Sequence, residues 1–179
     1  MIKTQQKNLE KAKILVLKTN LKLSKDIKTD DVKIFCKKID KIIKTLIGHK
    51  LITFTVIDNK LKFCERIYSN NSKIYPILGQ KKMPKNIWSE KVLKNKQHFL
   101  CKNKKDIKKI FYDYETIFSL GCGSIINLLV LFKKKPIGTI NILHKENHYK
   151  IKDLKKIDYL ITYLIPYFLD HQKIMERKI

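Results

Sequence analysis

The sequence predicts an α+β fold built on a mainly antiparallel sheet. Segments with helical periodicity lie toward both ends of the chain, and two pairs of strand-like segments lie between them, each pair joined by a short turn. Strands joined by short turns pair antiparallel. The first and last helices are then free to pack together on one face of the sheet, while short helices and a long loop cover the other face.

The first half of the chain contains one helix and one hairpin. Apolar residues recur at helical spacing over residues 30–47, and Gly48 is a suitable stop. The β-branched and aromatic segment 51–58 and the alternating segment 61–69 are typical of two strands joined by a turn. The stretch 70–84 contains Asn, Ser, Pro and Gly and is expected to be an ordered but irregular loop.

The middle of the chain indicates two helices around a short strand. Residues 86–96 and 106–121 have helical patterns, and the second helix is expected to break near Asp113. The short apolar segment 98–102 between them is typical of a strand.

The C-terminal part indicates a second hairpin and a long helix. Strand patterns over 124–132 and 137–144 flank the basic loop KKKP. The apolar stripe of 151–173 predicts a helix with a kink at Pro166, because proline removes a backbone donor and clashes with the preceding turn.

The length of 179 residues suits one domain with a sizeable core. We divide the chain into a lysine-rich extension (1–26), the domain (27–173) and a short tail (174–179). No apolar run approaches the ~20 residues of a membrane span, and the N-terminus lacks the uninterrupted apolar region of a signal peptide. No membrane association and a cytoplasmic location are therefore expected.

The formal charge of +24 raises the question of nucleic-acid binding. Arg66 and Arg177 are the only arginines among 40 basic residues, and Ala12 is the only alanine. This pattern is typical of AT-rich codons, and the lysines spread along the chain instead of forming one block. A nucleic-acid-associated protein therefore stays an alternative and is not the leading interpretation.

Four cysteines are widely spaced, without a CxxC pair: Cys36, Cys64, Cys101 and Cys122. In a chain of this length without a secretory signal they are expected to be free thiols. A zinc site needs closely spaced ligand pairs, so neither a metal nor a cofactor is expected.

The order of several short motifs resembles that of GAF domains, a small-molecule-binding fold common in sensors and signalling enzymes. The motifs are RIYS-(x)5-YP-(x)2-G (66–79), MPKNIW (83–88), FYD (111–113), SLGCGSIINLLV (119–130) and IGTINILHKENHY (137–149). The resemblance covers roughly residues 30–172 and is strongest to single-domain bacterial GAF proteins without an attached effector. It implies a cytoplasmic sensory or regulatory protein with a ligand pocket between the sheet and the layer that connects the two hairpins. It also implies that the terminal helices can form a homodimer.

Asn127 lies inside an otherwise apolar strand. A hairpin closed at KKKP places residues whose numbers sum to about 268 opposite each other, so Asn127 faces Asn141 across the strands. Either the two amides satisfy each other, or they form the pocket floor and hold a polar group of the ligand. Two amides offer donors and acceptors without charge, which suits a neutral or zwitterionic metabolite.

Three further residues are candidates for ligand contact. Tyr75 lies in the long loop and Trp88 follows it; such aromatic residues either seal the core or stack on a ligand. His144 ends the last predicted strand and is either a structural hydrogen-bonding residue or a contact to the ligand.

An enzymatic alternative uses the same pocket. Cys122 lies between two glycines and is the candidate nucleophile or redox thiol, with His144 as acid or base. Free-methionine sulfoxide reductases are GAF-fold enzymes that act through cysteines. The segment NIWSEK around Trp88 lacks the cysteine that they carry there, and Cys122 does not match the position of their other cysteine. Whether the chain catalyses a reaction stays open at this point.

Overall fold

The computed structural model describes residues 31–178, and a six-stranded antiparallel sheet forms its centre. The strand order is β3-β2-β1-β6-β5-β4. The strands are β1 (Leu51–Ile57), β2 (Phe63–Ser69), β3 (Gln80–Lys82), β4 (Phe99–Cys101), β5 (Ser124–Phe132) and β6 (Lys135–His144). The predicted α+β class and both predicted hairpins are confirmed.

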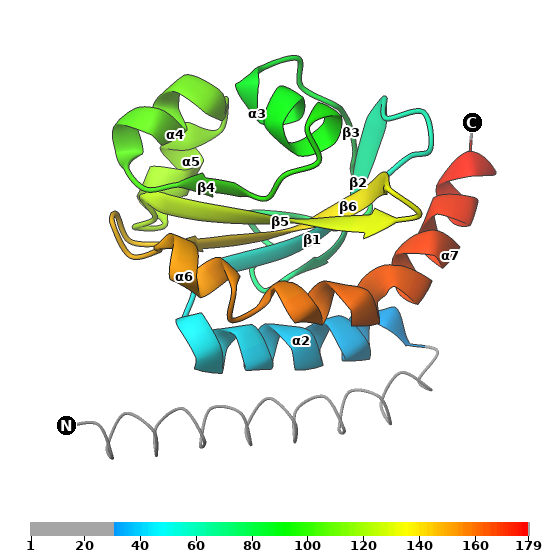
Figure 1. Ribbon diagram of the computed structural model, residues 1–179, viewed down its shortest axis with the longest axis horizontal. Helices are drawn as coiled ribbons and strands as arrows, with labels where there is room; N and C mark the ends of the chain where they lie inside the picture. The colour runs from blue at the N-terminus through cyan, green and yellow to red at the C-terminus, as the bar shows by residue number, and fades with distance from the viewer. Residues whose placement is uncertain (1–30, 179) are drawn as a thin grey trace.

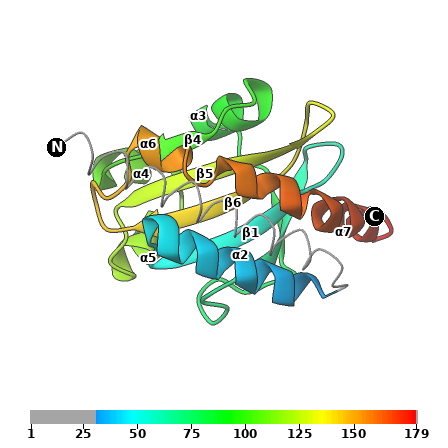
Figure 2. The same cartoon turned by 60° about the horizontal axis from the view of Figure 1, so that its bottom comes forward.

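One face of the sheet is covered by the first and last helices (Figures 1 and 2). These are α2 (Val32–Ile47), α6 (Ile151–Leu154), a 3-10 helix (Asp158–Leu164) and α7 (Ile165–Glu176). The rings of Phe35 on α2 and Tyr167 on α7 stack with centroids 4.6 Å apart. Packing of the terminal helices on one face is as predicted.

The opposite face is covered by short helical segments (Figure 1). They are α3 (Ile87–Ser89), a π-helical turn (Glu90–Lys94), α4 (Lys104–Ile110) and α5 (Tyr114–Ser119). The break between α4 and α5 falls at residues 111–113, where the sequence predicted it.

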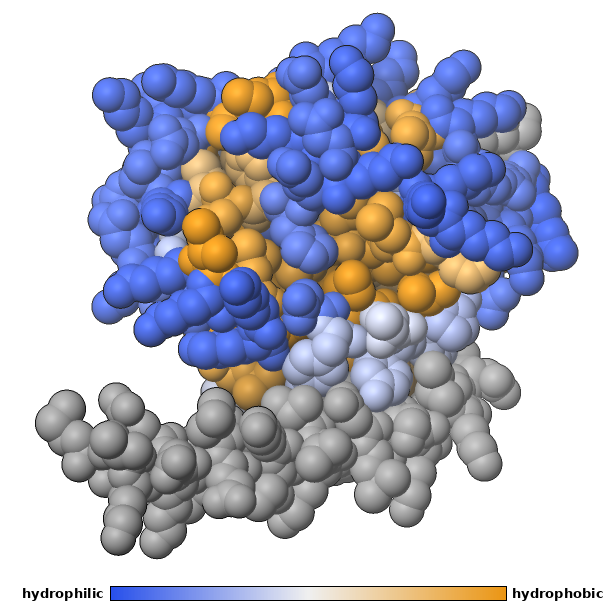
Figure 3. Space-filling view, in the orientation of Figure 1, coloured by the Kyte–Doolittle hydropathy of each residue, from blue (hydrophilic) through white to orange (hydrophobic). Residues whose placement is uncertain are grey.

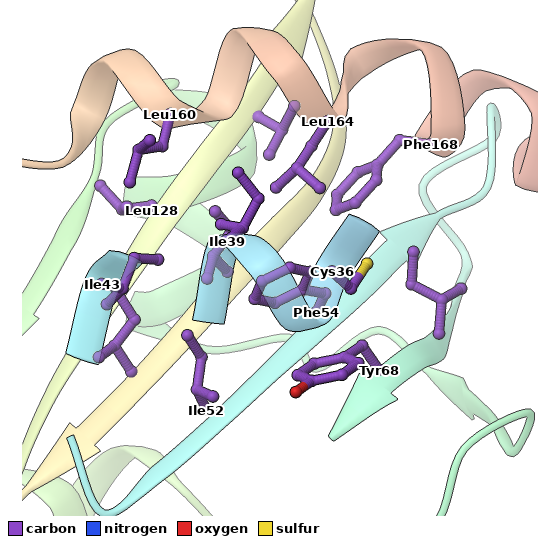
Figure 4. Packing of buried hydrophobic residues seen from close by; sticks show 14 of the residues in the cluster. Cys36, Ile39, Ile43, Ile52, Phe54, Tyr68, Leu128, Leu160, Leu164 and Phe168 are labelled. Atoms are coloured by element: carbon purple, nitrogen blue, oxygen red, sulfur yellow. The ribbon is translucent and has the colours of Figure 1, made fainter. Parts of the chain in front are cut away.

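The terminal helices bury a continuous apolar core against the sheet. In Figure 4, Ile39 and Ile43 of α2, Phe54 of β1 and Phe168 of α7 belong to one cluster between the terminal helices and the sheet. All four side chains are fully buried. Burying a side chain of this size contributes about 1.5–3 kcal/mol, so this cluster is the main source of stability on this face.

The ends of α2 are set by two residues. The side chain of Asp31 accepts hydrogen bonds from the backbone N–H groups of Lys33 and Ile34, which have no partner inside the helix. Gly48 ends the helix with a φ of 69°, a conformation that a side chain disfavours. The predicted helix over 30–47 and its stop at Gly48 are confirmed to within two residues.

The structure adds a strand that the sequence did not predict. Residues 80–82 of the stretch expected to be irregular form β3, which pairs with β2 at the edge of the sheet. All three of its residues are exposed. A strand that buries no side chain lacks the apolar alternation by which strands are recognised.

The helix predicted over residues 151–173 is not continuous in the structure. It is divided into α6, the 3-10 helix and α7, and Pro166 lies in the first turn of α7 and does not kink a longer helix. Proline is favoured there because the first-turn N–H groups have no helical partner. The last helix also ends later than predicted, because α7 continues to Glu176 and buries Met175.

Two further findings concern the N-terminal extension and the question of a membrane-spanning helix. The extension proposed for residues 1–26 lies outside the described residues. Within residues 31–178, no helix is both long and apolar enough to cross a membrane.

Candidate ligand-binding cavity

A cavity of about 700 Å³ lies between the sheet and the layer of short helices. Strands β1, β5 and β6 supply its floor: Leu51, Thr53, Thr55, Ile125, Asn127, Thr139, Asn141 and Leu143. Its walls come from the loop after β2, from β3 and the segment after it, from α3, and from the α4–α5 connection. The cavity is therefore where the GAF resemblance places a ligand pocket.

A chain of hydrogen bonds crosses the cavity floor. Trp88 Nε1 donates to Asn127 Oδ1 at 3.0 Å, and Asn127 Nδ2 donates to Asn141 Oδ1 at 2.7 Å. Asn141 Nδ2 then donates to the hydroxyls of Thr53 and Thr55 at 3.1 and 3.2 Å. Four elements, α3, β5, β6 and β1, are joined through these side chains.

The strand register brings this chain together. Asn127 pairs with Asn141 across β5 and β6, and Asn141 pairs with Thr53 across β6 and β1. The predicted cross-strand neighbours are confirmed. The two amides satisfy each other and also line the cavity, so the two interpretations of the pair are compatible.

The amide pair keeps some hydrogen-bonding capacity for a ligand. Each primary amide has two donors and two acceptor sites. One N–H of Asn127 and one lone pair of Asn141 Oδ1 are not used by the bonds described above, and the hydroxyl protons of Thr53 and Thr55 can still be donated. The floor therefore offers uncharged donors and acceptors.

Trp88 is held in place by a helix cap. The side chain of Asn86 accepts from the backbone N–H groups of Trp88 and Ser89, and Ser89 Oγ accepts in return from Asn86 N. The same Asn86 side chain donates to the carbonyl of Ile110 at the end of α4. This reciprocal capping fixes the direction in which the indole enters the cavity.

Tyr75 forms the opposite wall together with two charged residues. Its hydroxyl donates to Asp113 Oδ2 at 3.0 Å, and the guanidinium carbon of Arg66 lies 5.0 Å from its ring centroid. Burial, with the nearby Asp113, raises the pKa of Tyr75, so its hydroxyl stays protonated. Arg66 Nη1 also donates to the carbonyl of Pro76 at 2.8 Å. Arg66 and Tyr75 therefore fix the loop after β2 against the sheet.

The residues that line the cavity carry more positive than negative charge. Four cations line the cavity, Arg66, Lys81, Lys82 and Lys85, and Asp113 is the single carboxylate among the lining residues. The three lysines are exposed, whereas Arg66 is half-buried. Sequence reasoning did not select Arg66 or Asp113 as site residues. The rarity of arginine in this lysine-rich chain was a signal that could have identified Arg66.

The structure does not bring His144 to the cavity. Tyr75, Trp88, Asn127 and Asn141 line it, but His144 does not. The His144 ring instead stacks on His148 with centroids 3.6 Å apart. Desolvation by burial and the neighbouring His148 lower the pKa of His144 to about 4.

Cys122 is also absent from the cavity lining. Its side chain is fully buried in the apolar cluster on this side of the sheet, and burial raises the pKa of its thiol. A reactive cysteine needs an accessible, stabilised thiolate. Neither of the two catalytic candidates, Cys122 and His144, therefore lies where it could contact a ligand in the cavity.

A metal centre has no support in the described part of the chain. No group of three or more His, Cys, Asp or Glu side chains there is arranged to hold a metal ion.

No family model and no curated protein matches the chain. Solved structures do share its fold. The GAF domain of an Acinetobacter phosphoenolpyruvate-protein phosphotransferase has a TM-score of 0.67 and 10% identity, covering 89% of this chain and 96% of that one. The GAF domain of a Bacillus halodurans two-component sensor histidine kinase has a TM-score of 0.57 and 19% identity, covering 76% and 95%.

A third similar structure is an enzyme. The type II free methionine-R-sulfoxide reductase of Thermoplasma acidophilum has a TM-score of 0.54 and 11% identity, covering 74% of this chain and 95% of that one. Likenesses at these identities establish the fold alone. The chain has the fold of GAF domains.

Proposed function

We propose that the chain is a sensory or regulatory module that binds a small molecule in the cavity above β1, β5 and β6. The observation that carries the proposal is the cavity itself. Its volume of about 700 Å³ falls in the range of about 300–1,000 Å³ found for small-molecule sites. Its mixture of apolar walls and a few convergent polar groups is also typical of such sites.

The similar structures support a sensory role. One is the GAF domain of a sensor histidine kinase, and another comes from a methyl-accepting chemotaxis protein. These functions belong to those proteins. For this chain they favour ligand sensing over catalysis.

A thermal-shift screen against a metabolite library tests this proposal. A ligand at a hundredfold excess over its Kd stabilises the folded state by about 2.7 kcal/mol, which raises the Tm by several degrees. Met83→Trp places a larger side chain in the cavity lining and is expected to abolish the shift. Ile151→Gln, at an exposed position of α6 outside the cavity lining, is the matched control and should bind as the wild type does.

The alternative of a cysteine enzyme is favoured by the likeness to the Thermoplasma sulfoxide reductase. It predicts that Cys122 is reactive in the folded protein. The full burial of Cys122 and its raised thiol pKa argue against that expectation.

The alternative of a nucleic-acid-associated protein predicts one continuous basic face. In the view of Figure 3, the hydrophilic surface is interrupted by apolar areas. Binding to nucleic acid would weaken steeply with salt, because each neutralised phosphate releases counterions. A salt titration with a short DNA duplex and a short RNA duplex separates this alternative from ligand sensing.

The remaining expectations concern partners and location. We propose that two copies pair through α2 and α7 and that this pairing transmits the binding of the ligand. The proposed location of the protein is the cytoplasm. Ile34 on α2 and Ile174 on α7 are 49% and 47% exposed and are available for such pairing. Light scattering with and without a bound ligand tests the oligomeric state.

A further inference from the structure

Arg66 is a cation without an anionic partner in the cavity wall. It makes no ion pair with any described residue, and its Nε is buried without a hydrogen-bond partner there. Its contacts are the carbonyl of Pro76 and the ring of Tyr75. A desolvated guanidinium is strongly stabilised by a carboxylate, which matches its planar donors. The wall therefore presents an unused carboxylate-binding group.

Asp113 is the complementary group on the same wall. Its carboxylate accepts one hydrogen bond, from the Tyr75 hydroxyl, and it makes no ion pair among residues 31–178. Arg66 lies over the ring of Tyr75 and Asp113 lies at its hydroxyl, so the tyrosine holds the two charges on one wall without letting them pair. Opposite charges separated in this way leave room for a molecule that carries both.

The floor beside these charges is polar but uncharged. Thr55 of β1 is the cross-strand neighbour of Arg66 on β2 and accepts the amide hydrogen bond from Asn141. A row of hydroxyls and amides thus extends from Arg66 across the sheet to Trp88. Beyond the row, apolar residues such as Ile125 and Leu143 line the rest of the cavity.

The charges restrict the class of ligand. A polyphosphate or a dicarboxylate would bring excess negative charge next to Asp113, and a simple amine would leave Arg66 unpaired. The lysines of the lining do not alter this, because they are exposed and solvated; Lys81, for example, donates to Tyr112. A molecule with one anionic and one cationic group satisfies both residues.

We propose that the cavity ligand is a small zwitterion of the α-amino-acid class. Its carboxylate binds the guanidinium of Arg66 and its ammonium group binds the carboxylate of Asp113. The side chain of the ligand extends over the amide row toward Trp88 and the apolar part of the cavity. This inference rests on the proposed function of the cavity and specifies the chemistry of its ligand.

The experiment screens the twenty standard L-amino acids by thermal shift. The tightest binder is then compared by calorimetry with its α-amide, which lacks the carboxylate, and with its deaminated acid, which lacks the ammonium group. We expect at least one amino acid to bind and both analogues to bind at least tenfold more weakly.

Two variants assign the charges to residues. Arg66→Gln is expected to weaken amino-acid binding at least tenfold. It should also remove the preference for the amino acid over its α-amide. Asp113→Asn should remove the preference for the amino acid over the deaminated acid. Arg177→Gln, which changes the other arginine of the chain at an exposed position, is the matched control and should bind as the wild type does. The analogue comparison on the wild type decides the question even if a variant does not fold.

Two results would overturn the inference: no amino acid binds, or the α-amide and the deaminated acid bind as tightly as the amino acid. The proposed function is judged separately. If metabolites of another class bind and Met83→Trp abolishes their binding, the cavity is a ligand site and only the zwitterion assignment fails. If nothing in either set binds, both proposals fail.

Discussion

The indole Nε1 of Trp88 donates a hydrogen bond of 3.0 Å to the side-chain oxygen of Asn127. Trp88 belongs to α3, in the layer that covers the cavity, and Asn127 belongs to β5, in the cavity floor. One hydrogen bond between two buried side chains thus joins the two layers between which the ligand is proposed to bind. A ligand that contacts the floor is therefore positioned to affect the covering layer as well.

Asn127→Leu removes an acceptor from Trp88 and a donor from Asn141. Leaving buried polar groups without partners costs about 1–3 kcal/mol, and we expect a loss of that size in the free energy of unfolding measured with urea. Because the two amides share one hydrogen bond, Asn127→Leu combined with Asn141→Leu should cost less than the sum of the single changes. Additive losses would show that the amides are not energetically coupled.

The pairing of Asn127 with Asn141 could be predicted because it depends on one short hairpin. A tight turn fixes the register, and Lys133 and Lys134 form that turn with φ angles of 47° and 63°. The site roles of Arg66 and Asp113 could not be predicted in this way. They lie 47 positions apart and meet only through Tyr75, a relationship that depends on how the loop after β2 packs.

The placement of His144 shows where the sequence was misread. Side chains alternate along a strand, so Thr139, Asn141 and Leu143 of β6 share the cavity face and His144 does not. The alternation that turns Asn141 toward the cavity turns His144 away from it. The edge strand β3, in contrast, buries no side chain and gave no pattern to find.

Gly138→Ala is expected to destabilise the fold. A Cβ at this position of β6 would overlap the ring of Phe168 on α7 and the carbonyl oxygen of Thr55 on β1. Overpacking of this kind costs about 1–3 kcal/mol, measured as a lower midpoint of urea unfolding. Gly79→Ala is the matched control, because no atom lies within 4 Å of its Cβ position. Equal stabilities of the two variants would contradict the close approach of α7 to the sheet.

His144 makes the stability depend on pH. Its pKa is lowered to about 4 in the folded protein, first by burial and then by His148 and nearby lysines, whereas an unfolded histidine has a pKa of about 6.5. Between these values the unfolded chain binds a proton that the folded chain does not, so stability falls as the pH falls through this range. Urea unfolding at pH 7 and pH 5 should show a smaller loss for His144→Gln than for the wild type. Part of the loss should remain in the variant, because burial also lowers the pKa of His98. An identical loss in both proteins would contradict this assignment.

Cys122 is expected to be unreactive in the folded protein. It is fully buried and its thiol pKa is raised by burial. Iodoacetamide at neutral pH should therefore leave it unmodified in the folded chain and modify it once urea is added, as peptide mass spectrometry would report. Rapid modification of Cys122 in the folded protein would instead favour the alternative of a cysteine enzyme.

A small molecule is proposed to bind against the contact between Trp88 and Asn127. Trp88 is the only tryptophan of the chain, so its fluorescence reports on this cavity alone. The most direct test is to titrate the hits of the ligand screens while its emission is recorded. For the wild type we predict a saturable change whose midpoint equals the Kd measured by calorimetry, and calorimetry should detect no binding of the same ligand to Met83→Trp. A ligand that binds by calorimetry without changing the Trp88 emission, and that still binds Met83→Trp, would place the binding site elsewhere and contradict the account.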